Sequence, residues 1–240
     1  MYGLPEKQLS FLLRAGCDTL PTPMNLARCN IITSPVCTLC HCTQPTTNHI
    51  LTGCSIASIA LDQGRYTWRH DSVLQVLVRN FKKDLPPCYE IYADLPGHQA
   101  SVSPPSTIPP HITSTLSRPD LVVVSTDSIT LLELSVVTNT EHHRLAARNR
   151  KGDRYGSLLT DLQQAGCSVN LVTIEVGCLG HFMPQTVSKL SDVSPTVCHL
   201  PKNTIRCILQ QAARVAISCS YRIFNSRAST TWDVVNLFTC

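Results

Sequence analysis

Apolar and polar stretches follow one another along the second half of the chain in a pattern that predicts three strands and one long helix. Apolar runs at 120–124 and 129–137 are separated by a short polar turn, which predicts a hairpin of two antiparallel strands. A helical period follows at about 141–165 and ends at Gly166, the residue type that most often terminates a helix. A further apolar run at 169–176 predicts another strand.

The two hairpin strands are apolar on both faces, which sets the expected fold class. One face carries Leu121, Val123, Leu132 and Leu134, and the other carries Val122, Val124, Ile129 and Leu131. Strands of this kind are covered on both sides, because neither face can be left in water. We therefore expect an α/β fold, with a small mixed central sheet flanked by helices.

The remaining chain is predicted to be mostly helical. A helical pattern covers 7–30 and breaks at the two prolines Pro21 and Pro23, and shorter helices are predicted at 72–81 and 184–190, with a final helix at 204–224. Domain organisation is expected as follows: a helical segment at 1–34, a Cys-rich module with a bridging helix at 35–85, a Pro- and Ser-rich loop at 86–117, the main domain at 118–200, and a C-terminal helix at 201–240.

Cysteine content and the start of the chain indicate the compartment. The sequence has 13 Cys, and its first residues have neither the basic region nor the apolar run of a secretory signal. No stretch approaches the roughly 20 apolar residues of a membrane span. We expect reduced thiols, some of them bound to metal, in the cytosol or nucleus. The net charge of +4 fits a polyanionic partner without requiring one.

The Cys-rich segment has the spacing of a zinc site. Two thiols separated by two residues are followed by an imidazole and a third thiol: Cys37, Cys40, His49 and Cys54. Soft sulfur and imidazole ligands in a tetrahedral set select Zn²⁺, and four protein ligands make the site structural. His41 and Cys42 are alternative ligands, and buried reduced thiols without metal are the other interpretation.

Two acids are placed to face one another across the predicted hairpin. If Val124 pairs with Ile129, counting outward sets Asp120 opposite Glu133. Two carboxylates this close repel each other unless a cation lies between them, which predicts a divalent metal site for phosphodiester hydrolysis with Mg²⁺. The alternative is a structural role, because strand ends commonly carry Asp and Glu.

A cation is the third group that this chemistry needs. The position two residues after the second acid is Ser135, so the cation has to come from elsewhere. Lys151 lies on the stripe of the long helix that is expected to face the sheet, a stripe made by Leu145, Tyr155, Leu158 and Leu162. Arg148 and Arg154 are the alternatives, and a solvated basic helix face is the structural interpretation.

Taken together, these motifs resemble a known family over residues 8–190. The motifs are Arg118-Pro119-Asp120, Glu133-x-Ser135, Lys151-Gly-Asp-Arg154-Tyr155, the four zinc ligands and the run Arg65-Tyr-Thr-Trp-Arg69-His70-Asp71. They resemble the zinc knuckle and restriction-like endonuclease of site-specific non-LTR (LINE-type) retrotransposons, in the PD-(D/E)XK superfamily. The chain looks like the carboxyl-terminal part of such an element, either a fragment or a domesticated remnant.

The resemblance implies a restriction-endonuclease-like core that nicks double-stranded DNA to prime reverse transcription. Catalytic Asp120, Glu133 and Lys151 would work with Mg²⁺ beside a structural zinc. The implied partners are double-stranded DNA and, secondarily, element RNA, with no membrane and no small-molecule cofactor, in the nucleus after cytoplasmic synthesis. The residues expected to contact DNA are Arg65, Arg69, His70, Arg118, Arg148, Arg154 and Tyr155. Asp71 is interpreted as the cap of the helix at 72–81, and the alternative is the extra acid that related nucleases sometimes place on such a helix.

Two rival functions remain at this point. The first is a catalytically decayed DNA-binding remnant of a retroelement, which the Ser135 position favours. The second is a protein-interaction module that uses the zinc knuckle and the apolar stripe of the helix at 204–224.

Overall fold

The computed structural model describes most of the chain. The described residues are 3–59, 64–113, 115, 117–126, 128–138, 140–183, 185–192 and 200–234. Within these ranges, no helix is long and apolar enough to cross a membrane.

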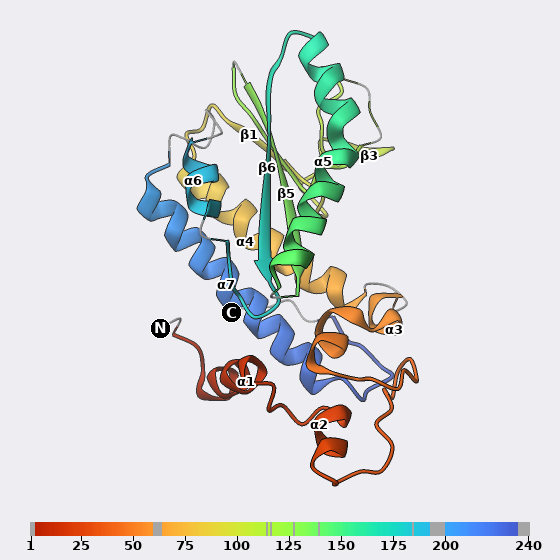
Figure 1. Ribbon diagram of the computed structural model, residues 1–240. Helices are drawn as coiled ribbons and strands as arrows, with labels where there is room; N and C mark the ends of the chain where they lie inside the picture. Colours follow the sequence, from red (N-terminus) through yellow and green to blue (C-terminus); the bar gives the residue numbers. More distant parts are fainter. Residues whose placement is uncertain are drawn as a thin grey trace.

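A four-stranded mixed sheet forms the centre of the molecule (Figure 1). Its strands are β1 (Glu90–Ala93), β4 (Leu121–Val124), β5 (Ser128–Val137) and β6 (Ser168–Gly177), in the order β1-β4-β5-β6. Neighbours are antiparallel across β1–β4 and β4–β5, and β5 and β6 are parallel because helix α5 connects them. The mixed α/β class predicted from the sequence is confirmed.

The predicted hairpin register is also confirmed. Val124 pairs with Ile129, and Leu121 pairs with Leu132. The residues that flank this last pair, Asp120 and Glu133, therefore lie opposite one another.

Helices cover both faces of the sheet, as the apolar pattern predicted (Figure 1). On one face lie α4 (Arg65–Asp84), α6 (Gln185–Asp192) and α7 (Lys202–Asn225), and their core includes Leu121, Val123, Leu132 and Leu134. On the other face α5 (Glu141–Gln164) places Tyr155, Leu158 and Leu162 against Val122, Ile129 and Leu131. Leu145, which was expected on this buried stripe, is 42% exposed.

The segment 86–117, predicted as a loop, contributes an edge strand. Besides β1 it holds a small hairpin of β2 (Ser101–Val102) and β3 (Pro105–Ser106). The sequence did not predict β1, because the segment around it is rich in Pro and Ser. In the structure β1 runs antiparallel to β4 along its full length. Edge strands tolerate such flanking sequence because only one side of the strand joins the ladder.

The amino-terminal part packs against one end of α4 and α7 (Figure 1). It consists of α1 (Glu6–Gly16), α2 (Pro23–Arg28), a π-helical turn η1 (His49–Gly53) and α3 (Ser55–Ile59). A second hydrophobic core joins α1 and η1 to the long helices through Phe11, Leu20, Leu51, Trp68 and Ile223. The amino-terminal part, α4 and α7 therefore share one core.

Helix α4 begins at Arg65, well before the predicted start at 72. Asp71 consequently lies inside the helix, so its interpretation as a helix cap is wrong. The apolar stripe of α7 (Ile205, Ile208, Leu209, Ala212 and Ile217) is buried in the core. That burial leaves none of this stripe for a protein partner.

Candidate functional site

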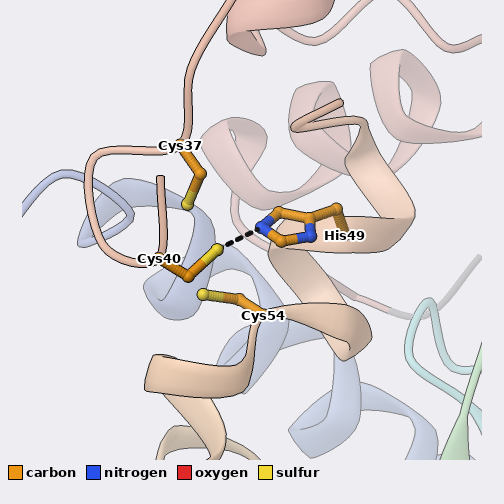
Figure 2. A group of neighbouring side chains, drawn as sticks. All are labelled: Cys37, Cys40, His49 and Cys54. Carbon is orange, nitrogen blue, oxygen red and sulfur yellow. Dashed lines mark hydrogen bonds between the residues drawn. The ribbon is translucent and has the colours of Figure 1, made fainter. Parts of the chain in front are cut away.

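The four predicted zinc ligands converge on one point near the amino terminus (Figure 2). Their ligand atoms all lie within 4.8 Å of one another. Cys40 Sγ and His49 Nε2 are 3.3 Å apart. Ligands around a tetrahedral Zn²⁺ are separated by roughly 3.3–3.8 Å, given metal–ligand bonds of about 2.0–2.3 Å. The group of Cys37, Cys40, His49 and Cys54 thus supports a structural zinc site.

A tight turn presents the first two thiols. The backbone N–H of His41 donates to the Cys37 carbonyl at 2.9 Å, and the Cys37 N–H donates to the Cys42 carbonyl at 2.9 Å. His41 takes the left-handed conformation at φ 58°, which closes the turn. Cys42 Sγ lies 3.7 Å from Nδ1 of His49, which is the ring nitrogen that faces away from Cys40. The group of converging ligand atoms includes neither Cys42 nor His41, the two alternative ligands.

Burial of the His49 imidazole favours metal binding. It lowers the pKa of His49 and so favours the neutral ring, which is the form that coordinates Zn²⁺.

Helix α4 is joined to this zinc module by two side chains. The Tyr66 hydroxyl accepts the N–H of Cys54 at 3.0 Å and is 3.0 Å from the Ile50 carbonyl. Arg69 donates to the Leu51 carbonyl at 2.9 Å and to Ser220 Oγ on α7 at 3.0 Å. The zinc module is therefore held against α4 by polar contacts as well as by the shared core.

Two arginines expected to contact DNA are instead structural. Arg65 is 3% exposed and donates to the carbonyls of Ser226 and Ser229 at 2.7 and 2.6 Å. Arg69 is 1% exposed and is engaged as described above. A phosphate cannot reach guanidinium groups buried in this way, so the structure places these two residues outside any DNA-contacting surface.

The second candidate site is an acidic cluster at the end of the β4–β5 hairpin. Asp120 and Glu133 are 8% and 0% exposed. The Asp120 N–H donates to Glu133 Oε1 at 3.0 Å, and the Leu134 N–H donates to Asp120 Oδ2 at 2.8 Å. These contacts fix both carboxyl groups on the face of the sheet that α5 covers.

Lys151 reaches both acids from α5. Its Nζ donates to Asp120 Oδ2 at 2.9 Å and also to Glu133 Oε2. One turn later on the same helix, the Tyr155 hydroxyl donates to the Arg118 carbonyl at 3.1 Å and fixes the chain just before Asp120. The three residues predicted as catalytic are therefore brought together, whereas Tyr155 is 3% exposed and acts as an anchor.

A histidine that was expected to contact DNA joins this cluster. Nε2 of His70 on α4 lies 3.4 Å from Asp120 Oδ2, and Nδ1 lies 3.0 Å from Asp71 Oδ1. The cluster therefore combines three carboxyl groups with two bases, His70 and Lys151. We name this set of five residues the acidic cluster.

The charges in the cluster shift one another's ionisation. Burial disfavours the ionised form of Asp120, but the contact with His70 and then the charge of Lys151 hold its pKa below the ordinary value. Burial, followed by the charge of Asp120, raises the pKa of Glu133 to about 7. Burial opposes protonation of His70, yet Asp120 and Asp71 raise its pKa to about 10. Of the two facing acids, Asp120 is therefore firmly ionised and Glu133 accepts a proton near neutral pH.

The remaining basic residues have different environments. Arg148 pairs with Glu175 on β6 through two hydrogen bonds of 3.1 and 2.8 Å, and Glu175 is 1% exposed. Arg118 is exposed and forms an ion pair with Asp94. Arg154 is exposed on α5. Of these residues, Arg118 and Arg154 lie on the surface where a phosphate can approach, while Arg148 is occupied by a buried partner.

Sequence reasoning missed two features of this region. Glu175 interrupts the apolar run of β6, and such a charge in a buried strand is a signal that a partner must exist. The role of His70 gave no local signal, because its partner Asp120 lies on a distant part of the chain.

Comparison with known proteins bears on the amino-terminal part. A search of curated proteins found no match to the chain. Residues 2–60 match the model of a family described as zinc-binding in reverse transcriptase, and this segment includes all four converging ligands. The amino-terminal part of the chain is therefore similar to the zinc-binding domain of reverse transcriptase-related proteins.

Proposed function

We propose that this chain is a Mg²⁺-dependent endonuclease that nicks double-stranded DNA, as in target-primed retrotransposition. The observation that carries the proposal is the convergence of Asp120, Glu133 and Lys151, whose ammonium group contacts both acids. The resemblance to the restriction-like endonucleases of LINE-type elements adds to it, and the zinc-binding match fits the same kind of polyprotein. The restriction-like assignment of the core is part of this proposal.

The donor set suits Mg²⁺ in kind. Magnesium binds one or two protein carboxylates and completes its shell with water and substrate phosphate. Every hydrogen bond of the Asp120 carboxylate among the described residues falls on Oδ2, which leaves Oδ1 as a free ligand atom. Bound there with Glu133 and the Leu134 carbonyl, the ion would supply Lewis acidity at the phosphate and an activated water.

The protein's own groups have separate tasks in this proposal. Lys151 neutralises the acid pair at rest and stabilises charge that develops on the phosphate. Tyr155 holds the backbone of Arg118 and so fixes the start of β4. Arg118 and Arg154, both exposed, would contact phosphates and position the duplex without reading sequence. Double-stranded DNA is the proposed partner, element RNA a secondary one, and the nucleus the proposed place of action.

A decayed DNA-binding remnant is the second candidate. Ser135 occupies the strand position where such nucleases usually carry the catalytic Lys. In addition, the Lys151 ammonium contacts both acids, so the protein itself supplies a cationic partner for the pair. A site that has lost its reaction could persist in this form as a buried ion triad.

A plasmid-nicking assay on the zinc-loaded chain separates the two candidates. Supercoiled DNA is incubated with and without Mg²⁺, and Mg²⁺ is omitted rather than chelated because EDTA would also remove zinc. We expect nicking only with Mg²⁺, abolished in Asp120→Ala, with DNA binding by the variant within a few fold of wild type. Binding without any cut in Mg²⁺ would favour the remnant. Nicking retained by Asp120→Ala would remove Asp120 from its role.

A further inference from the structure

We propose that His70 is a positioning residue of the acidic cluster: it holds Oδ2 of Asp120 so that Oδ1 stays free to bind the cation. This inference rests on the proposed function, because it assigns a task within the same site. The sequence motifs had placed His70 among the residues expected to contact DNA, and not in the catalytic site.

Three donors converge on a single carboxylate oxygen. Oδ2 of Asp120 accepts the Leu134 N–H at 2.8 Å and the Lys151 ammonium at 2.9 Å, and Nε2 of His70 lies 3.4 Å away. A carboxylate with all its donors on one oxygen is fixed in rotation about its C–C bond. The other oxygen is then presented in a constant direction.

The histidine ring is itself held in place. Asp71 Oδ1 lies 3.0 Å from Nδ1, while Nε2 on the other side of the ring faces Asp120 Oδ2. The two carboxyl groups therefore hold the ring from both sides and fix its orientation. The preceding residue, Arg69, is pinned to the zinc module and to α7, so the backbone that carries the ring is fixed as well.

His70 and Lys151 are not equivalent partners of Asp120. The lysine side chain is long, and its ammonium is shared between Asp120 and Glu133. With a cation and a phosphate bound, the Lys151 ammonium would have to shift toward the phosphate. His70 is anchored by Asp71 and contacts Asp120 alone of the two facing acids among the described residues, so it keeps Asp120 oriented while Lys151 moves. Supporting groups of this kind typically contribute a factor of about 10–100 in metal affinity or activity.

A pair of amide variants tests the geometry. In His70→Gln the side-chain amide can place an N–H where Nε2 lies and still reach Asp120. In His70→Asn the shorter amide can replace Nδ1 toward Asp71 but does not reach Asp120. Both variants are neutral and polar, so their effects on folding are matched. Thr67→Ala, at an exposed position of the same helix, serves as the control.

Two readouts are measured on the zinc-loaded full chain. The first is the affinity for Mn²⁺ alone, by calorimetric titration without DNA, and the second is the nicking rate in Mg²⁺. We expect His70→Asn to weaken both by about 10–100-fold. We expect His70→Gln to recover most of the loss, and Thr67→Ala to match the wild type. Unfolding midpoints and zinc content check that each variant is folded.

The outcomes distinguish this inference from the proposed function. Equal Mn²⁺ affinity in His70→Asn and wild type would overturn the positioning role even if the wild type nicks DNA. Equal losses in His70→Asn and His70→Gln would also overturn it, because they would show that the hydrogen bond to Asp120 is not what matters. A wild type that fails to nick, but binds Mn²⁺ more tightly than His70→Asn, would refute the endonuclease and support the positioning role.

Discussion

The zinc module and the acidic cluster, which is the site we propose for Mg²⁺, are assembled in different ways. The zinc ligands Cys37 and Cys54 bracket a short continuous segment, which a tight turn and a π-helical turn bring together. The acidic cluster draws His70 from α4, Asp120 from just before β4, Glu133 from β5 and Lys151 from α5. The first is local in the sequence, and the second exists only once the sheet and its covering helices have packed.

The difference shows where each site gets its rigidity. Metal binding itself supplies the folding free energy of a small Cys-rich module. The acidic cluster depends on the surrounding fold, because its buried carboxyl groups repel one another until bases from other elements reach them. Helix α4 connects the two regions, since Arg69 contacts the zinc module and the next residue, His70, contacts Asp120.

The largest effect is expected from removing zinc. Cys40→Ser should lower zinc content to near zero and destabilise the amino-terminal part by several kcal/mol, because structural zinc contributes about 10–16 kcal/mol in isolated finger peptides at pH 7. Metal analysis and limited proteolysis of residues 35–59 check this. Cys42→Ser is the matched control and should retain zinc. Zinc loss in Cys42→Ser to the same extent would contradict the ligand assignment.

A smaller but specific effect is expected from Lys151, the cation that we propose to be catalytic. Lys151→Met removes the charge that stabilises the phosphate and should slow nicking by about 10²–10³-fold, the usual cost of losing one such group. DNA affinity, measured by a gel-shift titration, should change little. Arg150→Ala removes an exposed cation of the same helix and should leave the rate unchanged. Comparable losses in both variants would show that Lys151 contributes only general positive charge and has no specific role at the phosphate.

The buried arginine between the two regions should affect stability and not DNA binding. Arg69→Met leaves the Leu51 carbonyl without its charged donor, which costs about 3 kcal/mol, the upper end for hydrogen bonds to charged groups. Thermal unfolding should shift down by roughly 6–12 °C for a chain of this size. A gel-shift titration at a temperature where the variant is folded should give wild-type affinity. Weakened DNA binding by the folded variant would return Arg69 to the set of phosphate contacts.

The smallest effect is expected at the surface. Arg154→Ala should weaken DNA binding by a few fold at all sequences and reduce the slope of log affinity against log salt by about 1. Binding titrations at several salt concentrations check this. A change confined to one DNA sequence would contradict a contact with phosphate alone.

Much of the fold followed from the sequence because it depends on local patterns. The hairpin register, the two apolar faces and the helix that ends near Gly166 all come from side-chain periodicity and turn residues. The edge strand β1 was missed because flanking Pro and Ser resemble a loop, and pairing with β4 decides its conformation. The start of α4 was missed because its first turn is held by distant parts of the chain: Tyr66 contacts the zinc module, and Arg65 contacts the segment that follows α7.

The two candidate sites also differ in how far they could be predicted from local sequence patterns. Four zinc ligands could be named from spacing, and the facing acids from the hairpin register, since both are local relationships. The reach of Lys151 to the acids followed from the helical period and the sheet-facing stripe. The positions of His70 and of the Arg148–Glu175 pair required the tertiary packing of α4, α5 and β6, which no local pattern specifies.

The most direct test of the central claim is a crystal of the zinc-loaded chain soaked in Mn²⁺, with anomalous diffraction measured at the zinc and manganese absorption edges. We expect a zinc peak among Cys37, Cys40, His49 and Cys54, and a separate manganese peak coordinated by Asp120 Oδ1 and Glu133 at roughly 2.0–2.3 Å. A zinc peak alone, with Lys151 still bridging both acids at saturating Mn²⁺, would contradict a catalytic metal site.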